Sequence, residues 1–219
     1  MECKTIILAK TSEHVRSIMQ GESSGHDWWH VWRVRRIVED IALQEKADLL
    51  VVGLAALLHD LDDYKLNAGV NSDELVKASA WLKQLDISAD IQAHVCEIIR
   101  NLSFSKNIGR TEAPRTIEGK VVQDAERVDG IGAIGIARVF AYGGAKGRMI
   151  YDPDIKPVKF TTPDEYKNSV STSINHFYEK VLLLKDTLNT ETAKRMAEEG
   201  HKYMMSFLDR FFLEWDGAG

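Results

Sequence analysis

The segment from Leu49 to Asp60, LLVVGLAALLHD, is the feature that most limits what this chain can fold into. Its first ten residues carry no charge, so they have to be almost completely buried in the folded protein. An apolar run of this kind suits either a buried strand or a central helix, because periodicity alone does not separate the two. Its length and its alanine and leucine content favour a helix. The polar pair His59 and Asp60 is therefore expected at the end of the most buried element.

The rest of the chain shows further helical patterns, which predicts an all-α protein. One buried helix face is marked by apolar residues at steps of three, four and three: Val31, Val34, Val38 and Ile41. Similar patterns predict helices over residues 5–19, 72–85, 89–102, 114–128, a segment ending near 143, 164–184 and 190–215. No segment shows the alternation typical of strands. We expect one domain over residues 1–219, with a core at about 22–145 and a C-terminal helical extension at about 160–216.

Composition limits the classes of function. The formal net charge of −5 argues against a surface that follows nucleic acid over a long distance. Cys3 and Cys96 lie far apart and form no CxxC motif, so neither a thiolate zinc site nor a disulfide framework is indicated. The N-terminal apolar run is too short for a signal peptide, and no run approaches the length that spans a bilayer. We therefore expect a cytoplasmic protein without a membrane partner.

The stretch from Gly25 to Val34, GHDWWHVWRV, adds polar side chains to a helix that has a buried face. His26, His30 and Arg33 are spaced by four and three residues, so they form a stripe beside the buried one. The two histidines are predicted to share a pocket. A lone buried histidine is more often a satisfied core residue than a ligand, so His30 alone does not indicate a metal site.

Two carboxylates lie where the flanking residues indicate the core. Asp60 ends the apolar run, and Asp124 lies among apolar neighbours in KVVQDAERV. A buried carboxylate is costly unless it is paired or coordinates a cation. We therefore predict that four residues converge on one divalent metal ion: His30, His59, Asp60 and Asp124. Two nitrogen and two oxygen donors suit Mn, Fe, Co, Ni, Zn or Mg.

In these residues the chain resembles the HD superfamily of metal-dependent phosphohydrolases, whose signature is H…HD…D on a helical core. The matching residues are His30, His59 with Asp60, and Asp124. The strings GHDWWHVWRV, LLHDLDDYK and KVVQDAERVDGIGAIGIARVFAYGG are similar to a subgroup of single-domain HD hydrolases that includes nucleoside triphosphate pyrophosphohydrolases. The resemblance covers nearly the whole chain and implies an HD-type helical core with additional C-terminal helices.

The resemblance also implies an acidic residue that orients or activates water close to the signature dipeptide. Asp63 lies four residues after His59, so it shares the ligand face if the helix continues, and we favour it over Asp62. Asp62 is expected to be solvated or to cap a helix. His26, one turn before His30, either contacts a phosphate or the leaving group, or orients a ligand. Both roles of His26 stay open.

A polyanionic substrate needs cationic side chains around it. The candidates are Lys65, Lys106, Lys120 and Arg127. Lys120 and Arg127 lie on the helical face of Asp124, where an ion pair with that carboxylate is the alternative role.

The leading hypothesis is a metal-dependent hydrolase of a small nucleotide, with a nucleoside triphosphate converted to a monophosphate and pyrophosphate. A 5′-nucleotidase or a phosphodiesterase of the same superfamily follows from the same metal chemistry. A non-catalytic nucleotide-binding module that keeps the metal as a structural staple is the alternative from another class, and Asp62, Asp63 and the basic residues argue against it. The long C-terminal helices are compatible with a cap over the pocket or with a homodimer face.

Overall fold

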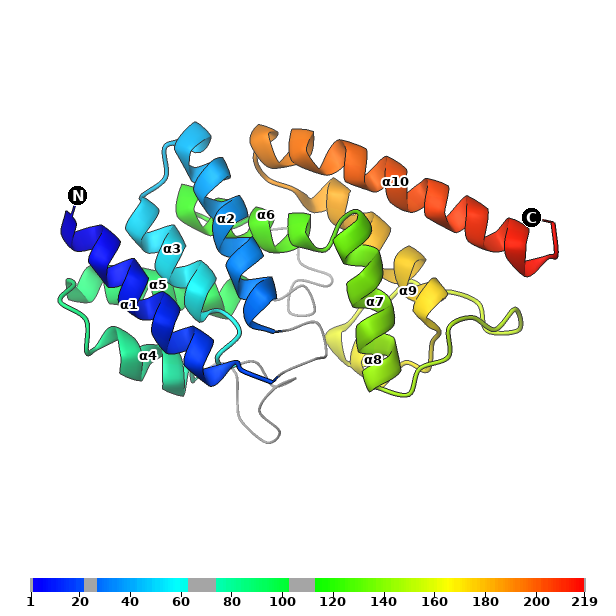
Figure 1. The fold of residues 1–219 in the computed structure, drawn as a ribbon, viewed down its shortest axis with the longest axis horizontal. Coiled ribbons are helices and arrows are strands. Elements are labelled where there is room, and N and C mark those ends of the chain that lie inside the picture. The colour runs from blue at the N-terminus through cyan, green and yellow to red at the C-terminus, as the bar shows by residue number, and fades with distance from the viewer. Residues whose placement is uncertain (1, 22–26, 63–73, 103–112, 219) are drawn as a thin grey trace.

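The computed structural model describes residues 2–21, 27–62, 74–102 and 113–218. Within these ranges it consists of helices and connections without a strand, which confirms the predicted all-α class (Figure 1). The helices in chain order are α1 (Glu2–Ile18), α2 (Trp28–Glu45), α3 (Leu49–Leu58), α4 (Val76–Leu82), α5 (Ala89–Leu102), α6 (Ile117–Asp129), α7 (Ala133–Ala145), α8 (Pro163–Asn168), α9 (Ser173–Glu179), the 3₁₀ helix η2 (Val181–Thr187) and α10 (Glu191–Trp215).

Helix α3 is the centre of the N-terminal half, as the apolar run predicts. It packs against α1, α2, α5 and α6, and its residues from Leu50 to Leu58 are buried. Asp48 caps its start, because the Asp48 Oδ1 atom accepts hydrogen bonds from the backbone N–H groups of Leu50 and Val51 at 2.8 and 3.4 Å. Since the helix is surrounded along its length, the residues that follow Leu58 are delivered into the interior.

Helices α2 and α6 pack along each other and against α3. The predicted apolar stripe of α2 is fully buried, at 0% exposure for each member: Val31, Val34, Val38 and Ile41. Asp27 caps the start of α2 by accepting a hydrogen bond from the backbone N–H of His30 at 2.8 Å. This buried stripe sets the rotation of α2 about its axis, and therefore the direction of His30.

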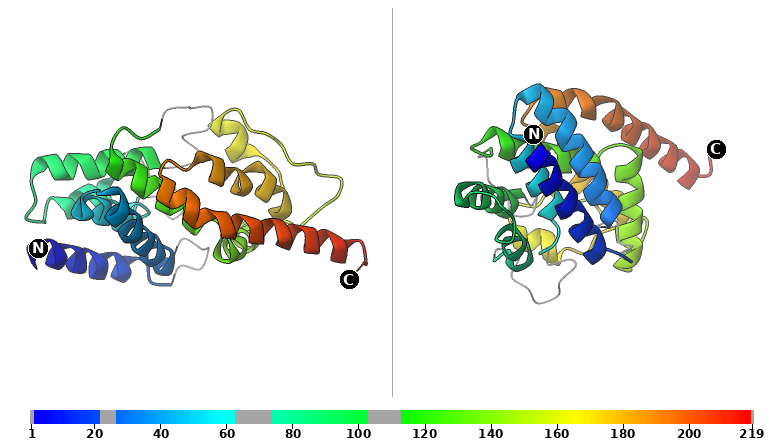
Figure 2. Two further views of the ribbon diagram at one scale, coloured as in Figure 1. Left: turned by 90° about the horizontal axis from the view of Figure 1, so that it is seen from above. Right: turned by 60° about the vertical axis from the view of Figure 1, so that its left-hand side comes forward.

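The C-terminal half is formed by α7, α8, α9, η2 and α10, with α10 contacting α2, α6, α7 and η2. Buried hydrophobic side chains from both halves form one contiguous cluster. The two ends of the chain lie at opposite ends of the molecule (Figures 1 and 2). The boundary between a core and a C-terminal extension stays a prediction.

None of the helices in the described ranges combines the length and the apolar composition needed to cross a membrane.

The single helix predicted over residues 164–184 is wrong. Three short helices, α8, α9 and η2, occupy this region. Helix α9 starts anew at Thr172, whose side chain accepts a hydrogen bond from the backbone N–H of Asn175 at 3.1 Å. Hydroxyl side chains compete for backbone hydrogen bonds and favour helix caps, so the sequence SVSTS at 169–173 interrupts the helical pattern.

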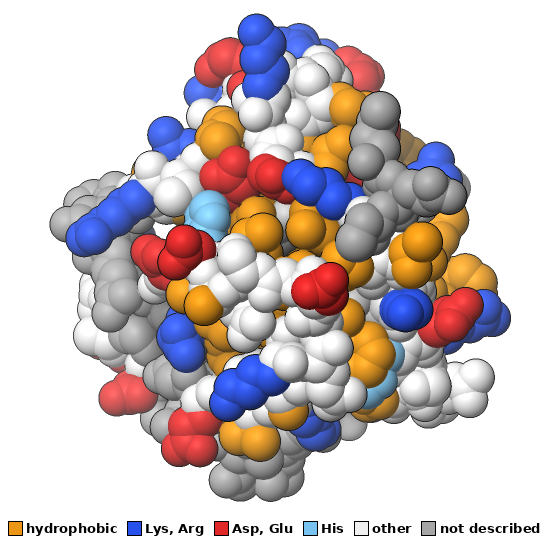
Figure 3. Space-filling view, turned by 90° about the vertical axis from the view of Figure 1, so that its left-hand side faces the viewer, with side chains coloured by type: hydrophobic (Ala, Val, Ile, Leu, Met, Phe, Trp, Pro, Cys, Tyr) orange, Lys and Arg blue, Asp and Glu red, His pale blue; other side chains and the backbone are white. Residues whose placement is uncertain are grey.

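A groove lies between α1 and α4, at the end of the molecule that carries the N-terminus. It is lined by Ile6, Ile7, Lys10, Trp81, Gln84, Leu85 and Asp86. Figure 3 shows this end of the molecule, where hydrophobic side chains are exposed between acidic and basic ones. None of the residues that line the groove belongs to the predicted site.

Candidate metal centre

His30 projects into the interior from the first turns of α2. Its side chain is completely buried, at 0% exposure, because it lies beside the apolar stripe of the helix. The ring Nδ1 atom lies 2.8 Å from Asp129 Oδ2, at the end of α6. The Nε2 atom, on the other side of the ring, faces the residues that follow α3.

His59 and Asp60 follow directly after the last residue of α3 and are both buried. The Nδ1 atom of His59 lies 2.8 Å from the backbone oxygen of Ala56. A carbonyl oxygen only accepts, so Nδ1 has to carry the proton and donate it. The neutral His59 ring therefore presents the lone pair of its Nε2 atom.

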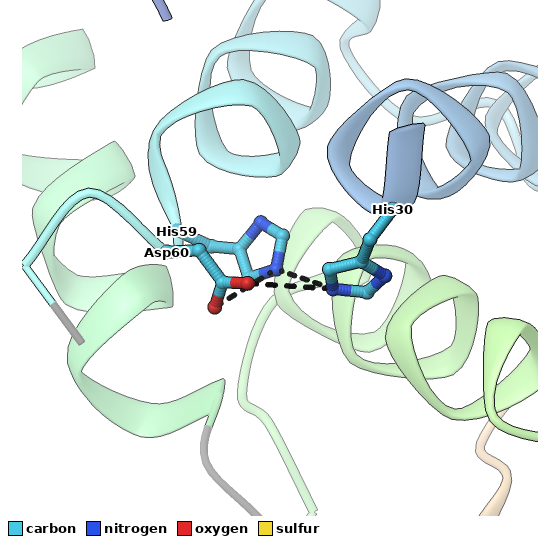
Figure 4. Close-up of side chains that lie close together, drawn as sticks. All are labelled: His30, His59 and Asp60. Atoms are coloured by element: carbon cyan, nitrogen blue, oxygen red, sulfur yellow. Dashed lines mark hydrogen bonds and ion pairs between the residues drawn. The ribbon is translucent and has the colours of Figure 1, made fainter. Parts of the chain in front are cut away.

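His30, His59 and Asp60 come together in one cluster, as predicted (Figure 4). The two Nε2 atoms are 3.3 Å apart. Asp60 Oδ2 lies 3.5 Å from His30 Nε2, and Asp60 Oδ1 lies 3.3 Å from His59 Nε2. One donor atom from each residue falls within 4.8 Å of the others, a spacing at which the three side chains can ligate one ion.

Glu126, on α6, supplies a fourth donor that was not predicted. Its Oε2 atom lies 3.2 Å from His30 Nε2 and 3.3 Å from His59 Nε2. Among the described residues this buried oxygen has no hydrogen-bond partner. A buried carboxylate oxygen without a donor is costly unless a cation satisfies it. The two imidazole nitrogens, the Asp60 carboxylate and the Glu126 oxygen beside them therefore suit a divalent metal ion.

Asp124 is buried as predicted, at 0% exposure, but it does not join this cluster. Its Oδ1 atom accepts from the backbone N–H and the side-chain amide of Asn189, at 2.8 and 2.7 Å. Its Oδ2 atom accepts from the backbone N–H and the hydroxyl of Thr190, both at 2.7 Å. The predicted place of Asp124 among the ligands is therefore corrected: this carboxylate fixes the start of α10.

Helical geometry explains why Glu126, rather than the predicted Asp124, lies in the cluster. Successive residues of a helix are rotated by about 100°, so two residues separated by two positions point to nearly opposite sides. Glu126 and Asp129 are three positions apart and share a side. The spacing of the acids in QDAERVD places Asp124 on a different side from Glu126 and Asp129, but it does not show which side faces the cluster.

Asp129 connects the cluster to two arginines. Its carboxylate accepts from Arg33 Nε at 2.6 Å, Arg33 Nη2 at 3.2 Å and Arg138 Nη1 at 2.7 Å, besides its contact with His30. Burial by itself would raise the pKa of Asp129, but the hydrogen bonds and charges of His30 and both arginines lower it. Arg33 was expected on the histidine face of α2, whereas Asp129 and Arg138 were not identified.

The pKa values of the cluster show that it attracts positive charge. Burial by itself lowers the pKa of His59, but the carboxylates of Asp60 and Glu126 raise it to about 10. The pKa of His30 is also raised, because Glu126 and Asp129 outweigh burial and the charge of Arg138. In turn, burial would raise the pKa of Glu126, but the two histidines hold it well below its ordinary value.

The remaining predicted residues lie elsewhere. His26, Asp63, Lys65 and Lys106 fall outside the described residues. Arg127 is buried and donates to the backbone oxygen of Thr187, which links α6 to η2, and its contact with substrate stays a prediction. Burial lowers the pKa of Arg127 to about 10, against the opposing charge of Asp124. Lys120 is half-buried, one turn before Asp124, on the side of α6 away from Glu126.

Asp62 caps a helix, one of the two roles expected for it. Its Oδ1 and Oδ2 atoms accept from the backbone N–H groups of Lys77 and Ala78, at 3.0 and 2.9 Å. The side chain is 2% exposed. Both carboxylate oxygens of Asp62 therefore accept hydrogen bonds at the start of α4.

Known proteins are similar to this chain in both sequence and fold. The model of the HD domain family matches residues 28–131, a span that contains all four donors. YpgQ of Bacillus subtilis (strain 168) is 40% identical over 211 residues, which cover 94% of this chain and 91% of YpgQ.

Three solved structures resemble this chain over nearly its whole length. A protein from Lactobacillus plantarum has a TM-score of 0.86 at 36% identity, covering 97% of this chain and 98% of the other. An HD-superfamily hydrolase from Bacillus thuringiensis has a TM-score of 0.73 at 42% identity, covering 97% and 98%. Bacillus subtilis YpgQ in complex with ADP has a TM-score of 0.73 at 36% identity, covering 95% and 100%. The chain therefore belongs to the HD domain family, within the HD superfamily of hydrolases.

Proposed function

We propose that this protein is a metal-dependent phosphohydrolase that acts on a small nucleotide and converts a nucleoside triphosphate to a monophosphate and pyrophosphate. The observation that carries the proposal is the convergence of three buried side chains, His30, His59 and Asp60, with the buried Oε2 atom of Glu126, which has no hydrogen-bond partner among the described residues. The ADP complex of the relative YpgQ supports a nucleotide as the ligand. The hydrolase superfamily supports the reaction class.

Each residue of the cluster would have a defined part. The Nε2 atoms of His30 and His59, with the carboxylates of Asp60 and Glu126, would hold the ion. The hydrogen bond from His59 to the backbone of Ala56 orients that ring for the purpose. When bound, a divalent ion supplies Lewis-acid polarisation of a phosphoryl oxygen and lowers the pKa of water.

Arg33 and Arg138 would supply the positive charge that a polyanionic substrate needs. Both donate hydrogen bonds to the carboxylate of Asp129, which lies beside His30. The Arg33 and Arg138 side chains are 26% and 17% exposed, so part of each side chain is accessible from solvent. In the proposed reaction the oxygen of water bonds to the α-phosphorus, and the bond to the oxygen bridging the α- and β-phosphorus breaks. Asp63 as water-activating base and His26 as phosphate or leaving-group contact stay predictions.

A panel of nucleotides tests the proposal. The protein is stripped of metal with a chelator and reloaded separately with Mn, Ni, Co, Fe, Zn or Mg, and then incubated with nucleoside tri-, di- and monophosphates and a phosphodiester. Separation of the products by ion exchange is expected to show equal amounts of monophosphate and pyrophosphate from a triphosphate. Orthophosphate from monophosphates would indicate a 5′-nucleotidase instead, and cleavage of the diester alone a phosphodiesterase. Binding without turnover under every metal would overturn the enzymatic proposal and indicate a metal-stapled binding module.

A further inference from the structure

We propose that Asp129 is a positioning residue that fixes the His30 ring with its proton on Nδ1, so that the Nε2 lone pair faces the cluster. The inference rests on the proposed metal centre, and it concerns how this chain prepares one of the ligands. The Asp129 carboxylate contacts Nδ1 of the His30 ring, whereas the other donors face its Nε2 atom on the opposite side of the ring.

The first argument is the geometry of the His30 ring. Its Nδ1 atom lies 2.8 Å from Asp129 Oδ2, and both side chains are almost completely buried, at 0% and 2% exposure. An ionised carboxylate only accepts, so the proton of this hydrogen bond belongs to Nδ1. In a neutral ring the second nitrogen then carries no proton. A ligating histidine needs this tautomer, and a carboxylate on the far nitrogen both selects it and holds the ring plane.

The second argument is that Asp129 is itself held rigidly. Arg33 donates two hydrogen bonds in a fork, from Nε to Oδ1 and from Nη2 to Oδ2, and Arg138 donates a third to Oδ2. The three side chains come from α2, α6 and α7. Guanidinium groups stay charged and keep the carboxylate ionised, so it acts as an acceptor only. Three helices therefore determine the position of the acceptor that faces His30.

The third argument is the contrast with His59. Its Nδ1 atom donates to the backbone oxygen of Ala56, in the last turn of its own helix. His30 lies in the first turns of α2, and the partner of its Nδ1 atom comes from another helix. Asp129 accepts from Nδ1 of His30, as a backbone carbonyl does for His59. This role explains why the buried Asp129 carboxylate lies next to a proposed metal ligand without being a ligand itself.

The test compares Asp129→Ala with Asp129→Asn and uses Asp124→Ala as the matched control. Asp124 lies on the same helix, is as deeply buried and also loses its hydrogen bonds on truncation, but its partners, Asn189 and Thr190, directly precede α10. Mn²⁺ affinity is measured by electron paramagnetic resonance, and thermal stability is measured in excess chelator. Asp129→Ala is expected to weaken Mn²⁺ binding by about 10- to 100-fold, the range found for lost outer partners of metal ligands. Asp129→Asn is expected to recover part of this, because its amide oxygen still accepts from Nδ1.

The control separates positioning from folding. Asp124→Ala is expected to lose stability in chelator but to keep the Mn²⁺ affinity of the unchanged protein. Equal affinity in Asp129→Ala and the unchanged protein would overturn the inference, as would an equal loss of affinity in Asp124→Ala. If Asp129→Ala does not fold, nuclear magnetic resonance of the zinc-loaded, histidine-labelled unchanged protein decides the question, with His30 assigned by comparison with His30→Gln. A His30 ring proton on Nδ1 is expected, and a bare Nδ1 would overturn the inference. A protein that binds metal but hydrolyses no nucleotide would overturn only the proposed function.

Discussion

At the scale of single residues, the four donors work as a set because their charges do not balance without a cation. Asp60 and Glu126 each carry a negative charge as carboxylates. An imidazole with an ordinary pKa is mostly uncharged at pH 7, so the two histidines beside them would not balance that charge. The raised pKa values of His30 and His59 show that protons can fill this role. A metal ion and these protons therefore compete for the same nitrogen atoms.

Metal affinity is expected to rise with pH. The pKa of His59 is about 10 in the metal-free protein, so this ring is protonated at pH 8 and has to lose its proton before it can ligate. Lowering the pH favours the protonated form of the ring. For each proton that the metal ion has to displace, the apparent affinity falls by about tenfold per unit decrease in pH. Calorimetric titration with Mn²⁺ in two buffers of different ionisation enthalpy measures the protons released. Binding that does not change between pH 6 and 9 would contradict this competition.

Glu126 rather than Asp124 is expected to control metal binding. Glu126→Gln removes a charged donor and should weaken Mn²⁺ affinity by more than ~100-fold, beyond the range for an outer partner, with a matching loss of turnover. Asp124→Asn is the matched control, because it makes the same change of carboxylate to amide two residues away on the same helix. It should lower stability but leave Mn²⁺ affinity unchanged. The reverse result, loss of metal in Asp124→Asn alone, would return Asp124 to the ligand set.

Arg33 is expected to act on substrate binding. Arg33→Met removes the guanidinium and should raise KM for a nucleoside triphosphate by about tenfold or more, since a hydrogen bond to a charged group contributes ~1.5–3 kcal/mol. Arg33→Lys keeps a charge but not the fork, so it should lie between Met and the unchanged protein. Steady-state kinetics at saturating metal measures KM and kcat separately. An unchanged KM in Arg33→Met would exclude a substrate contact.

The cluster residues differ in how far the sequence predicts them. His30, His59 and Asp60 are predictable because a helix stripe and an apolar run locate them directly. Apolar neighbours also show that the segment around Asp124 is buried, and it is. They do not show which side of α6 faces the metal centre, because α10 covers the other side and needs polar partners of its own. That choice depends on packing between distant segments.

At the scale of helices, the start of α4 depends on one carboxylate. Asp62 accepts hydrogen bonds from two of the N–H groups that a helix start leaves without partners. Asp62→Ala is expected to lower the free energy of unfolding by about 1–3 kcal/mol, because it removes a cap from buried donors. Asp62→Asn keeps an acceptor and should cost less. Urea denaturation followed by circular dichroism measures both, and Mn²⁺ affinity should stay unchanged in each variant.

Helix prediction succeeds where one amphipathic pattern is uninterrupted. The boundaries of α5 agree with the predicted range of 89–102, and α10 begins and ends within a residue of the predicted 190–215. It fails over 164–184, where Glu179 accepts from the hydroxyl of Ser171 and the backbone N–H of Val158. Ser171 lies between α8 and α9, and Val158 lies outside the predicted helical range, so the helical pattern alone does not reveal these contacts.

At the scale of the whole molecule, the candidate metal centre joins side chains from three helices, of which α6 is distant in sequence from the other two. His30 comes from α2, His59 and Asp60 from the end of α3, and Glu126 from α6. A bound ion would therefore act as a cross-link within the N-terminal half. The general position of this centre is predictable from sequence, but the way α10 is tied to α6 through Asp124 is not.

Metal removal is expected to lower thermal stability. A ligand at 100 times its dissociation constant stabilises the folded state by about 2.7 kcal/mol, and for a chain of this size each kcal/mol changes Tm by about 2–4 °C. Chelation should therefore lower Tm by roughly 5–10 °C relative to protein with Mn²⁺ at that excess. Differential scanning calorimetry measures the shift. Glu126→Gln should show little difference with and without metal, whereas an equally large shift in that variant would argue for a different binding site.

Helix α6 places three acidic side chains in two opposite directions, toward α10 through Asp124 and toward His30 through Glu126 and Asp129. One inserted or deleted residue between Asp124 and Glu126 would rotate one end of the helix by about 100° relative to the other. A single substitution on the surrounding helices would not restore both the contacts of Asp124 and those of Glu126 and Asp129. The number of residues between these three acidic side chains is therefore constrained as well as their identity, and this part of α6 should tolerate replacement of its other residues far better than a change of length.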